Sequence, residues 1–155
     1  MNRPKTTEPV RLTWAEKDGT VLIEPEDEDR YSLTVEQVIE ACQAYDPQKK
    51  VQVRKAFAHL LGKLAGWVND HADKVDKAFL TRRYRNLLFL VIMKEKRHDE
   101  QLEDELSAID LQIAREKQFA DIRLCVLALP HCEAEDYLHF IDPEFYLMYR
   151  GPRAQ

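Results

Sequence analysis

The sequence predicts an α/β protein, with an α+β arrangement as the alternative, and three observations support this prediction. Residues 87–93 form a continuous apolar run that is short for a helix and typical of a strand covered on both faces. A second buried strand is predicted at residues 122–130, which are apolar except for Arg123. Between them, residues 99–117 repeat apolar side chains at helical spacing. A strand, a helix and a strand of these lengths predict a βαβ unit with parallel strands.

The N-terminal part predicts a β-hairpin at about residues 10–25. Apolar and polar side chains alternate over residues 10–14, and the turn-forming Lys17, Asp18 and Gly19 precede a second apolar stretch. The acidic run that ends the hairpin is expected to be a solvated connection.

The next segment, about residues 34–85, is predicted to contain three helices. The first runs from Thr34, whose hydroxyl would cap the first turn, to about Tyr45. Asp46 and Pro47 predict the start of the second. Its apolar stripe consists of Val53, Phe57, Leu60, Leu61, Leu64, Trp67 and Val68. A third, shorter helix is expected at about residues 71–85, with Val75 and Phe79 inward.

The βαβ core, about residues 87–149, completes the prediction. After the second strand we expect a short helix at about residues 133–140. The terminal segment from residue 144 is interpreted as an edge strand, because it alternates less cleanly. Together these elements predict a single domain over residues 1–155.

Composition places the chain among globular proteins. Its 155 residues are 45% apolar and 33% charged, and no run approaches the roughly 20 apolar residues of a membrane-spanning helix. The first ten residues lack the apolar stretch of a signal peptide, and the 3 cysteines show no CxxC spacing. We therefore expect a cytoplasmic protein with reduced thiols and no membrane partner.

The net charge of -5 is unevenly distributed along the chain. Residues 46–97 hold 13 Lys and Arg against 5 Asp and Glu, so a basic middle lies between acidic ends. Clustered positive charge with an interleaved aromatic ring suits phosphate groups or an acidic partner. The candidate contacts are Lys55, Lys63, Arg82, Arg83, Tyr84 and Arg85. The alternative is a set of solvated helix faces balanced by the acidic segments.

A second candidate site follows from the predicted βαβ unit, because ligands of parallel sheets bind beyond the carboxyl ends of strands. His98 and Asp99 follow the first strand, and His131 and Cys132 follow the second. They contain the ingredients of a thiol nucleophile with an imidazole base, or of a zinc site. The alternative is ordinary helix capping and strand-end surface. No phosphate-binding loop, nucleophile elbow or metal-binding motif is present, so no cofactor or metal is predicted.

The third candidate is a protein interface at Trp14, Tyr146 and Tyr149, since aromatic residues are enriched at interfaces. These side chains would serve equally well in the core. Without a catalytic signature, the leading hypothesis is a non-enzymatic binding module, a subunit or regulator that contacts another protein or a second copy. Nucleic-acid binding is the alternative. A small hydrolase or metal-dependent enzyme at the strand ends is the second alternative.

Overall fold

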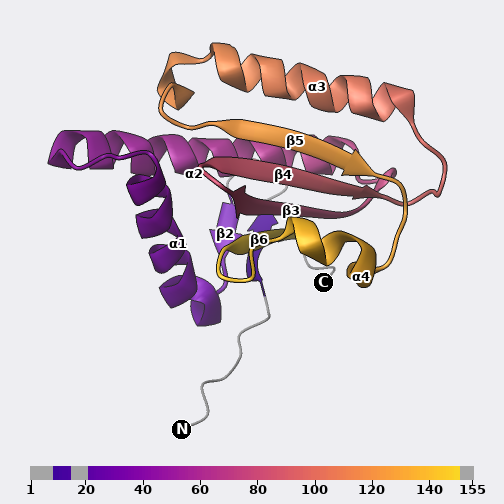
Figure 1. The fold of residues 1–155 in the computed structure, drawn as a ribbon, viewed down its shortest axis with the longest axis horizontal. Coiled ribbons are helices and arrows are strands. Elements are labelled where there is room, and N and C mark those ends of the chain that lie inside the picture. Colours follow the sequence, from indigo (N-terminus) through magenta and orange to yellow (C-terminus); the bar gives the residue numbers. More distant parts are fainter. Residues whose placement is uncertain (1–8, 15–20, 151–155) are drawn as a thin grey trace, which may run out of the picture.

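The computed structural model describes residues 9–14 and 21–150 of the chain. Six strands form one mixed sheet in the order β2-β1-β6-β3-β4-β5 (Figure 1). The strands are β1 (Val10–Trp14), β2 (Val21–Ile23), β3 (Val75–Arg83), β4 (Asn86–Met93), β5 (Leu124–Leu129) and β6 (Tyr146–Arg150). The α-helices are α1 (Glu28–Ala41), α2 (Pro47–Asp70), α3 (Glu100–Arg115) and α4 (Ala134–Tyr137). Short 3-10 turns are η1 (Pro25–Asp27), η2 (Lys117–Phe119) and η3 (Leu138–Phe140).

The predicted βαβ unit is present as β4, α3 and β5, which confirms the α/β fold class. The two strands are parallel, beginning with Leu87 opposite Leu124. Asp99 caps α3, because its carboxylate accepts a hydrogen bond from the Leu102 N–H at 3.0 Å. The N-terminal hairpin is also present, since β1 and β2 pair antiparallel. Its expected turn, residues 17–19, lies outside the described residues.

Helix α2 begins where the sequence predicts. Pro47 occupies its first position, and Asp46 accepts a hydrogen bond from the Gln48 N–H at 3.1 Å. The predicted apolar stripe of α2 is buried in the main core, on the face of the sheet that α3 also covers. On the opposite face, Tyr137 and Ile141 help form a second, smaller core. In Figure 1, α2 lies behind the sheet and α4 in front of it.

The predicted third helix, at residues 71–85, is wrong. This segment forms β3, which pairs with β4 on one side and β6 on the other. Because both faces of β3 are covered, the consecutive residues from Ala78 to Thr81 are all buried. Val75 and Phe79 have a spacing that a helix and a doubly covered strand both allow. Tertiary burial here overrides a composition rich in helix-forming lysine, alanine and arginine.

The first helix begins earlier than predicted, at Glu28, and ends at Ala41. Thr34 lies inside it and does not cap it. The Thr34 hydroxyl donates a hydrogen bond to the Arg30 carbonyl one turn earlier, at 2.8 Å. The acidic run that was expected to be a solvated connection forms η1 and the first turn of α1, and Asp27 within it is 1% exposed.

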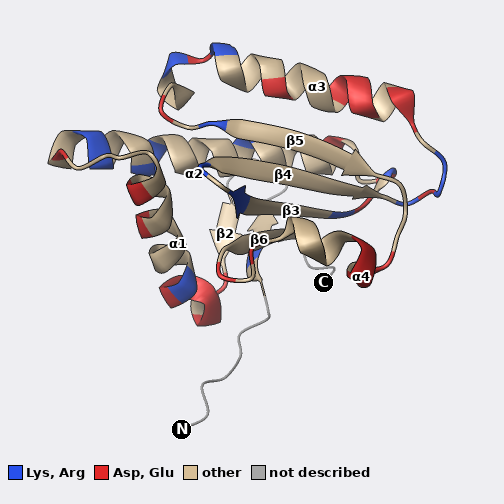
Figure 2. Cartoon of the chain, viewed as in Figure 1, with Lys and Arg blue, Asp and Glu red and all other residues tan. Residues whose placement is uncertain are grey.

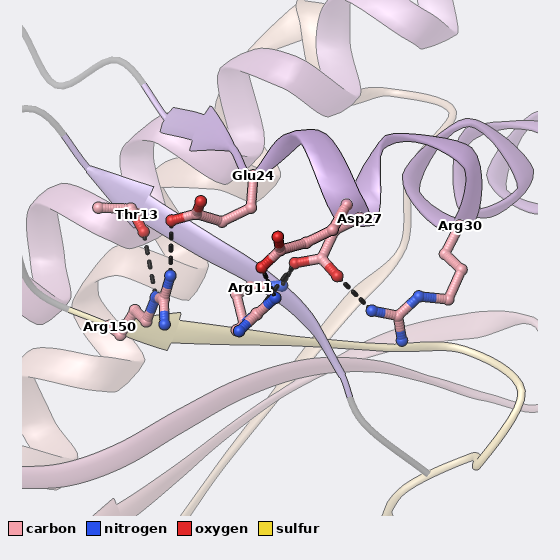
Figure 3. Close-up of polar contacts among 7 residues, drawn as sticks. Arg11, Thr13, Glu24, Asp27, Arg30 and Arg150 are labelled. Atoms are coloured by element: carbon pink, nitrogen blue, oxygen red, sulfur yellow. Dashed lines mark hydrogen bonds and ion pairs between the residues drawn. The ribbon is translucent and has the colours of Figure 1, made fainter. Parts of the chain in front are cut away.

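Asp27 is the centre of a polar network between the hairpin and α1 (Figure 3). Its carboxylate accepts hydrogen bonds from the backbone N–H and the Nε of Arg11, at 3.3 and 3.0 Å, and from Arg30. Burial raises the pKa of Asp27, but the hydrogen bonds from both arginines outweigh burial and hold that pKa below its usual range. Nearby, Arg150 of β6 donates to Glu24 at 2.6 Å.

The terminal segment was predicted to be an edge strand, and this prediction is wrong. The segment forms β6, an interior strand of the sheet. β6 lies between β1, to which it is parallel, and β3, to which it is antiparallel. Leu147 and Tyr149 are consequently buried. The outermost strand beside β4 is β5, whose side chains are half-buried or exposed. β5 has apolar residues on both faces because each face packs against one of the two cores. Its sequence therefore did not indicate that β5 lies at the edge of the sheet.

Candidate binding site at the tip of the β3–β4 hairpin

The β3–β4 hairpin ends in the most exposed large hydrophobic side chain of the described residues. Arg83 pairs with Asn86, so Tyr84 and Arg85 form a two-residue turn. Tyr84 has a φ of 59°, which bulky residues rarely adopt, and its side chain is 88% exposed. Residues held in rarely populated backbone conformations cluster at functional sites, which makes this turn a candidate.

The base of the hairpin is fixed by a buried hydroxyl. Thr81 donates a hydrogen bond to the Phe145 carbonyl at 2.7 Å and accepts one from the Asp142 N–H at 2.9 Å. This places the Asp142 carboxylate 3.0 Å from Nη2 of Arg82. The charge of Arg82 is therefore balanced within the fold, and this arginine contributes little net charge at the tip.

The other arginines at this end of the sheet are differently placed. The Arg83 guanidinium lies 5.5 Å from the centroid of the Phe140 ring, which orients it. Arg85 and Arg123 are exposed and line a narrow crevice beside the hairpin. Neither forms an ion pair with any other residue that the structure describes. Figure 2 shows this basic character at the hairpin tip and at the start of β5, on the same end of the sheet.

The remaining candidate contacts, Lys55 and Lys63, lie on α2 instead of the hairpin. Lys55 is exposed, and Nζ of Lys63 lies 3.1 Å from the Glu116 carboxylate. Acidic residues from the flanking segments balance further basic residues in three pairs, which are Lys49 with Asp121, Arg54 with Glu36, and Lys74 with Asp99. With Arg82, five of the 13 basic residues of the middle are therefore paired with carboxylates.

The strand-end residues have separate partners. His98 lies 2.8 Å from the Glu103 carboxylate on α3, and Asp99 caps that helix. His131 lies 3.8 Å from the Asp76 carboxylate on β3. The two histidines thus lie beside different carboxylates, and chemistry at this edge of the sheet stays a prediction.

The backbone does bring the two strand-end loops together, since the His131 N–H donates to the Glu95 carbonyl at 2.9 Å. Burial raises the pKa of the Cys132 thiol, and the carboxylates of Asp136 and Glu133 raise it further. A nucleophilic cysteine needs the thiolate, which these surroundings disfavour. Within residues 9–14 and 21–150, no group of three or more His, Cys, Asp or Glu could hold a metal ion.

Two of the three aromatic residues predicted at a protein interface belong to the core, which corrects that prediction. Trp14 is 6% exposed, and its indole N–H donates to Asn69 of α2 at 3.2 Å. Tyr149 is 4% exposed, and its hydroxyl donates to the Leu61 carbonyl at 3.0 Å. Both side chains therefore use their polar atoms within the fold. Tyr146 is half-buried.

Sequence reasoning missed an interaction in the open groove between α2 and α3. Nδ1 of His71 lies 2.7 Å from the Trp67 carbonyl, and Nε2 contacts the Glu105 carboxylate. The hydrogen bond from His71 lowers the pKa of Glu105. Because both ring nitrogens are engaged, none is left to act on a substrate, and we interpret the pair as a clamp between helices. Its residues are far apart in the sequence, which leaves no local signal.

No helix among the described residues combines the length and apolar character needed to cross a membrane. Comparisons with protein-family models, with curated proteins and with solved structures find no match to this chain.

Proposed function

We propose that this protein is a non-enzymatic binding module that contacts an acidic partner protein through the tip of the β3–β4 hairpin. The observation that carries the proposal is the exposed Tyr84, held in a left-handed turn between Arg83 and Arg85. Tyrosine and arginine are the residue types most enriched among the anchors of protein interfaces. The three free cysteines suit a reducing cytoplasmic setting, which is part of the proposal.

Charge favours a protein over a nucleic acid as the partner. A protein that binds nucleic acid strongly neutralises about 6–10 phosphates. Here five of the 13 cations of the basic middle are paired with carboxylates, and the chain carries a net charge of -5. The few exposed arginines at the hairpin match a short acidic segment better than a phosphate backbone.

Photo-crosslinking at the hairpin tests this proposal. A benzoylphenylalanine placed at Tyr84 is expected to crosslink one defined acidic protein in the producing cells. Arg83→Glu combined with Arg85→Glu should abolish that product, because the anchoring charges are reversed. The matched control is a benzoylphenylalanine at Leu111, a 56% exposed position on α3. The same products from both positions, or none from Tyr84, would contradict the proposal.

Nucleic acid is the second candidate, because single strands stack on exposed aromatic rings beside cations. This candidate predicts that a labelled single-stranded oligonucleotide binds and that its affinity falls as salt rises. Reversing Arg83 and Arg85 to Glu should weaken binding, whereas Lys96→Glu, an exposed charge in a different loop, should not. Fluorescence anisotropy measures this, and an absence of binding at low salt excludes the candidate.

A further inference from the structure

We infer that the crevice beside the hairpin is a subsite for a single carboxylate of the partner. The inference rests on the proposed function, since it names the chemical group that the binding module would receive. The crevice is formed by the end of α1, the base of the β3–β4 hairpin and the segment that leads into β5. Three chain segments distant in the sequence therefore converge on it.

The residues that line this crevice include two arginines without an ion pair among the described residues. Of its charged lining residues, Arg82 is paired with Asp142, and Asp121 is paired with Lys49 at 3.5 Å. Arg85 and Arg123 remain without an ion pair among the described residues. These two lining residues come from different segments, and arginine binds carboxylates through charge-assisted hydrogen bonds.

A polar group in the crevice wall has no partner. Oε1 of Gln37, on α1, is buried and forms no hydrogen bond. An unpaired buried polar atom costs about 1–3 kcal/mol. The two ends of a glutamine amide are nearly alike in shape, so a half-turn presents its NH₂ as a donor. In that orientation the NH₂ would donate to a bound carboxylate oxygen.

Most of the remaining lining is apolar, and the enclosed space sets the size of the ligand group. Val38, Leu87, Ile122 and Phe145 contribute to it, so a charge pair there is less screened than at the open surface. The enclosed space holds about one or two water-sized groups. A carboxylate head fits this space with its chain outside, whereas a tetrahedral phosphate is bulkier. These features favour a glutamate, an aspartate or a chain-terminal carboxylate of the partner.

Titration of the purified protein with sodium acetate, followed by NMR, tests the subsite without the partner. At constant ionic strength, the side-chain amide of Gln37 and the backbone amide of Leu87 are expected to shift saturably. Arg85→Gln and Arg123→Gln should each raise the dissociation constant about tenfold, which is the loss of one charge-assisted hydrogen bond. Arg115→Gln is the matched control, because Arg115 is an exposed cation outside the crevice lining.

The outcomes separate this inference from the proposed function. No saturable shift at Gln37, or equal weakening by Arg115→Gln, overturns the carboxylate subsite even if the crosslink at Tyr84 is found. Tighter saturation by inorganic phosphate than by acetate also overturns it, since the natural group would then be a phosphate. Saturation by acetate without a crosslinked partner supports the subsite and overturns only the proposed role of the hairpin in protein binding.

Discussion

Replacing Asp27 by alanine is expected to lower the free energy of unfolding at neutral pH by about 2–4 kcal/mol. The carboxylate is buried, and its loss leaves the hydrogen-bond donors of Arg11 and Arg30 without their acceptor. Both arginines are about a quarter exposed and regain some hydration, so the expected loss is below that of a fully buried pair. Urea unfolding followed by circular dichroism measures the change.

The matched control is Glu26→Ala, which removes the neighbouring carboxylate on the same arginine. Glu26 is 65% exposed, and its removal should change stability by less than about 1 kcal/mol. Equal losses from the two substitutions would show that burial of Asp27 is not what matters.

The same carboxylate makes stability depend on pH, and the sign follows from its depressed pKa. In the unfolded chain Asp27 binds a proton near pH 4, whereas the folded state holds it ionised to lower pH. Its contribution is therefore fully present above about pH 5 and is lost as pH falls through the folded pKa. The stability difference between the wild type and Asp27→Ala should shrink on acidification, and an unchanged difference at pH 3 would contradict the assignment.

Replacing Phe89 by alanine is expected to cost about 3–5 kcal/mol of unfolding free energy. Phe89 is 0% exposed on β4 and meets Trp67 and Tyr149 edge to face, with centroids 5.8 and 6.1 Å apart. It therefore connects β4 to α2 and to β6, which lies on the other side of β3, and its removal leaves a cavity that rigid aromatic rings cannot close.

A conservative series distinguishes the cavity from the lost aromatic contacts. Phe89→Leu keeps most of the volume and should cost less than half as much as the alanine substitution. Phe140→Ala, on the other face of the sheet, is the matched control, because its side chain is only half-buried. Chemical denaturation with a constant m-value measures all three. A cost below about 1 kcal/mol for Phe89→Ala would place the main core elsewhere.

Local sequence patterns were sufficient to predict the helices and strands that have capping residues or a regular apolar spacing of their own. The proline and aspartate at the start of α2, its apolar stripe, the doubly apolar β4 and the capped α3 could all be predicted. The β3 segment could not, because its charged ends and helix-forming residues conceal the four consecutive buried positions that the sheet imposes. The order of strands in the sheet is likewise decided by pairing between distant segments, and the spacing of apolar residues within one segment does not indicate which segments pair.

The candidate sites also divide into features formed by adjacent residues, which the sequence predicted, and features formed by distant residues, which it did not. The sequence identified Tyr84 and its arginine neighbours as a cluster, because they are adjacent in the chain. It could not reveal that Arg82 is neutralised by Asp142, nor that Arg123 and Gln37 come to the same crevice, since those contacts span many residues. The buried Asp27 was hidden in a run of acidic residues that resembles solvated chain.

The interior position of β6 has a consequence for the order in which the protein can assemble. Among the strands that the structure describes, this one is synthesised last, yet it joins β1 to β3 in the sheet. While the ribosome is still translating the preceding segments, the β1–β2 hairpin and the β3-β4-β5 portion share no strand pairing. The central gap between them exposes two unpaired strand edges, which are templates for aggregation in a nascent chain. Sheet closure must therefore wait for the arrival of Tyr146–Arg150 from the exit tunnel.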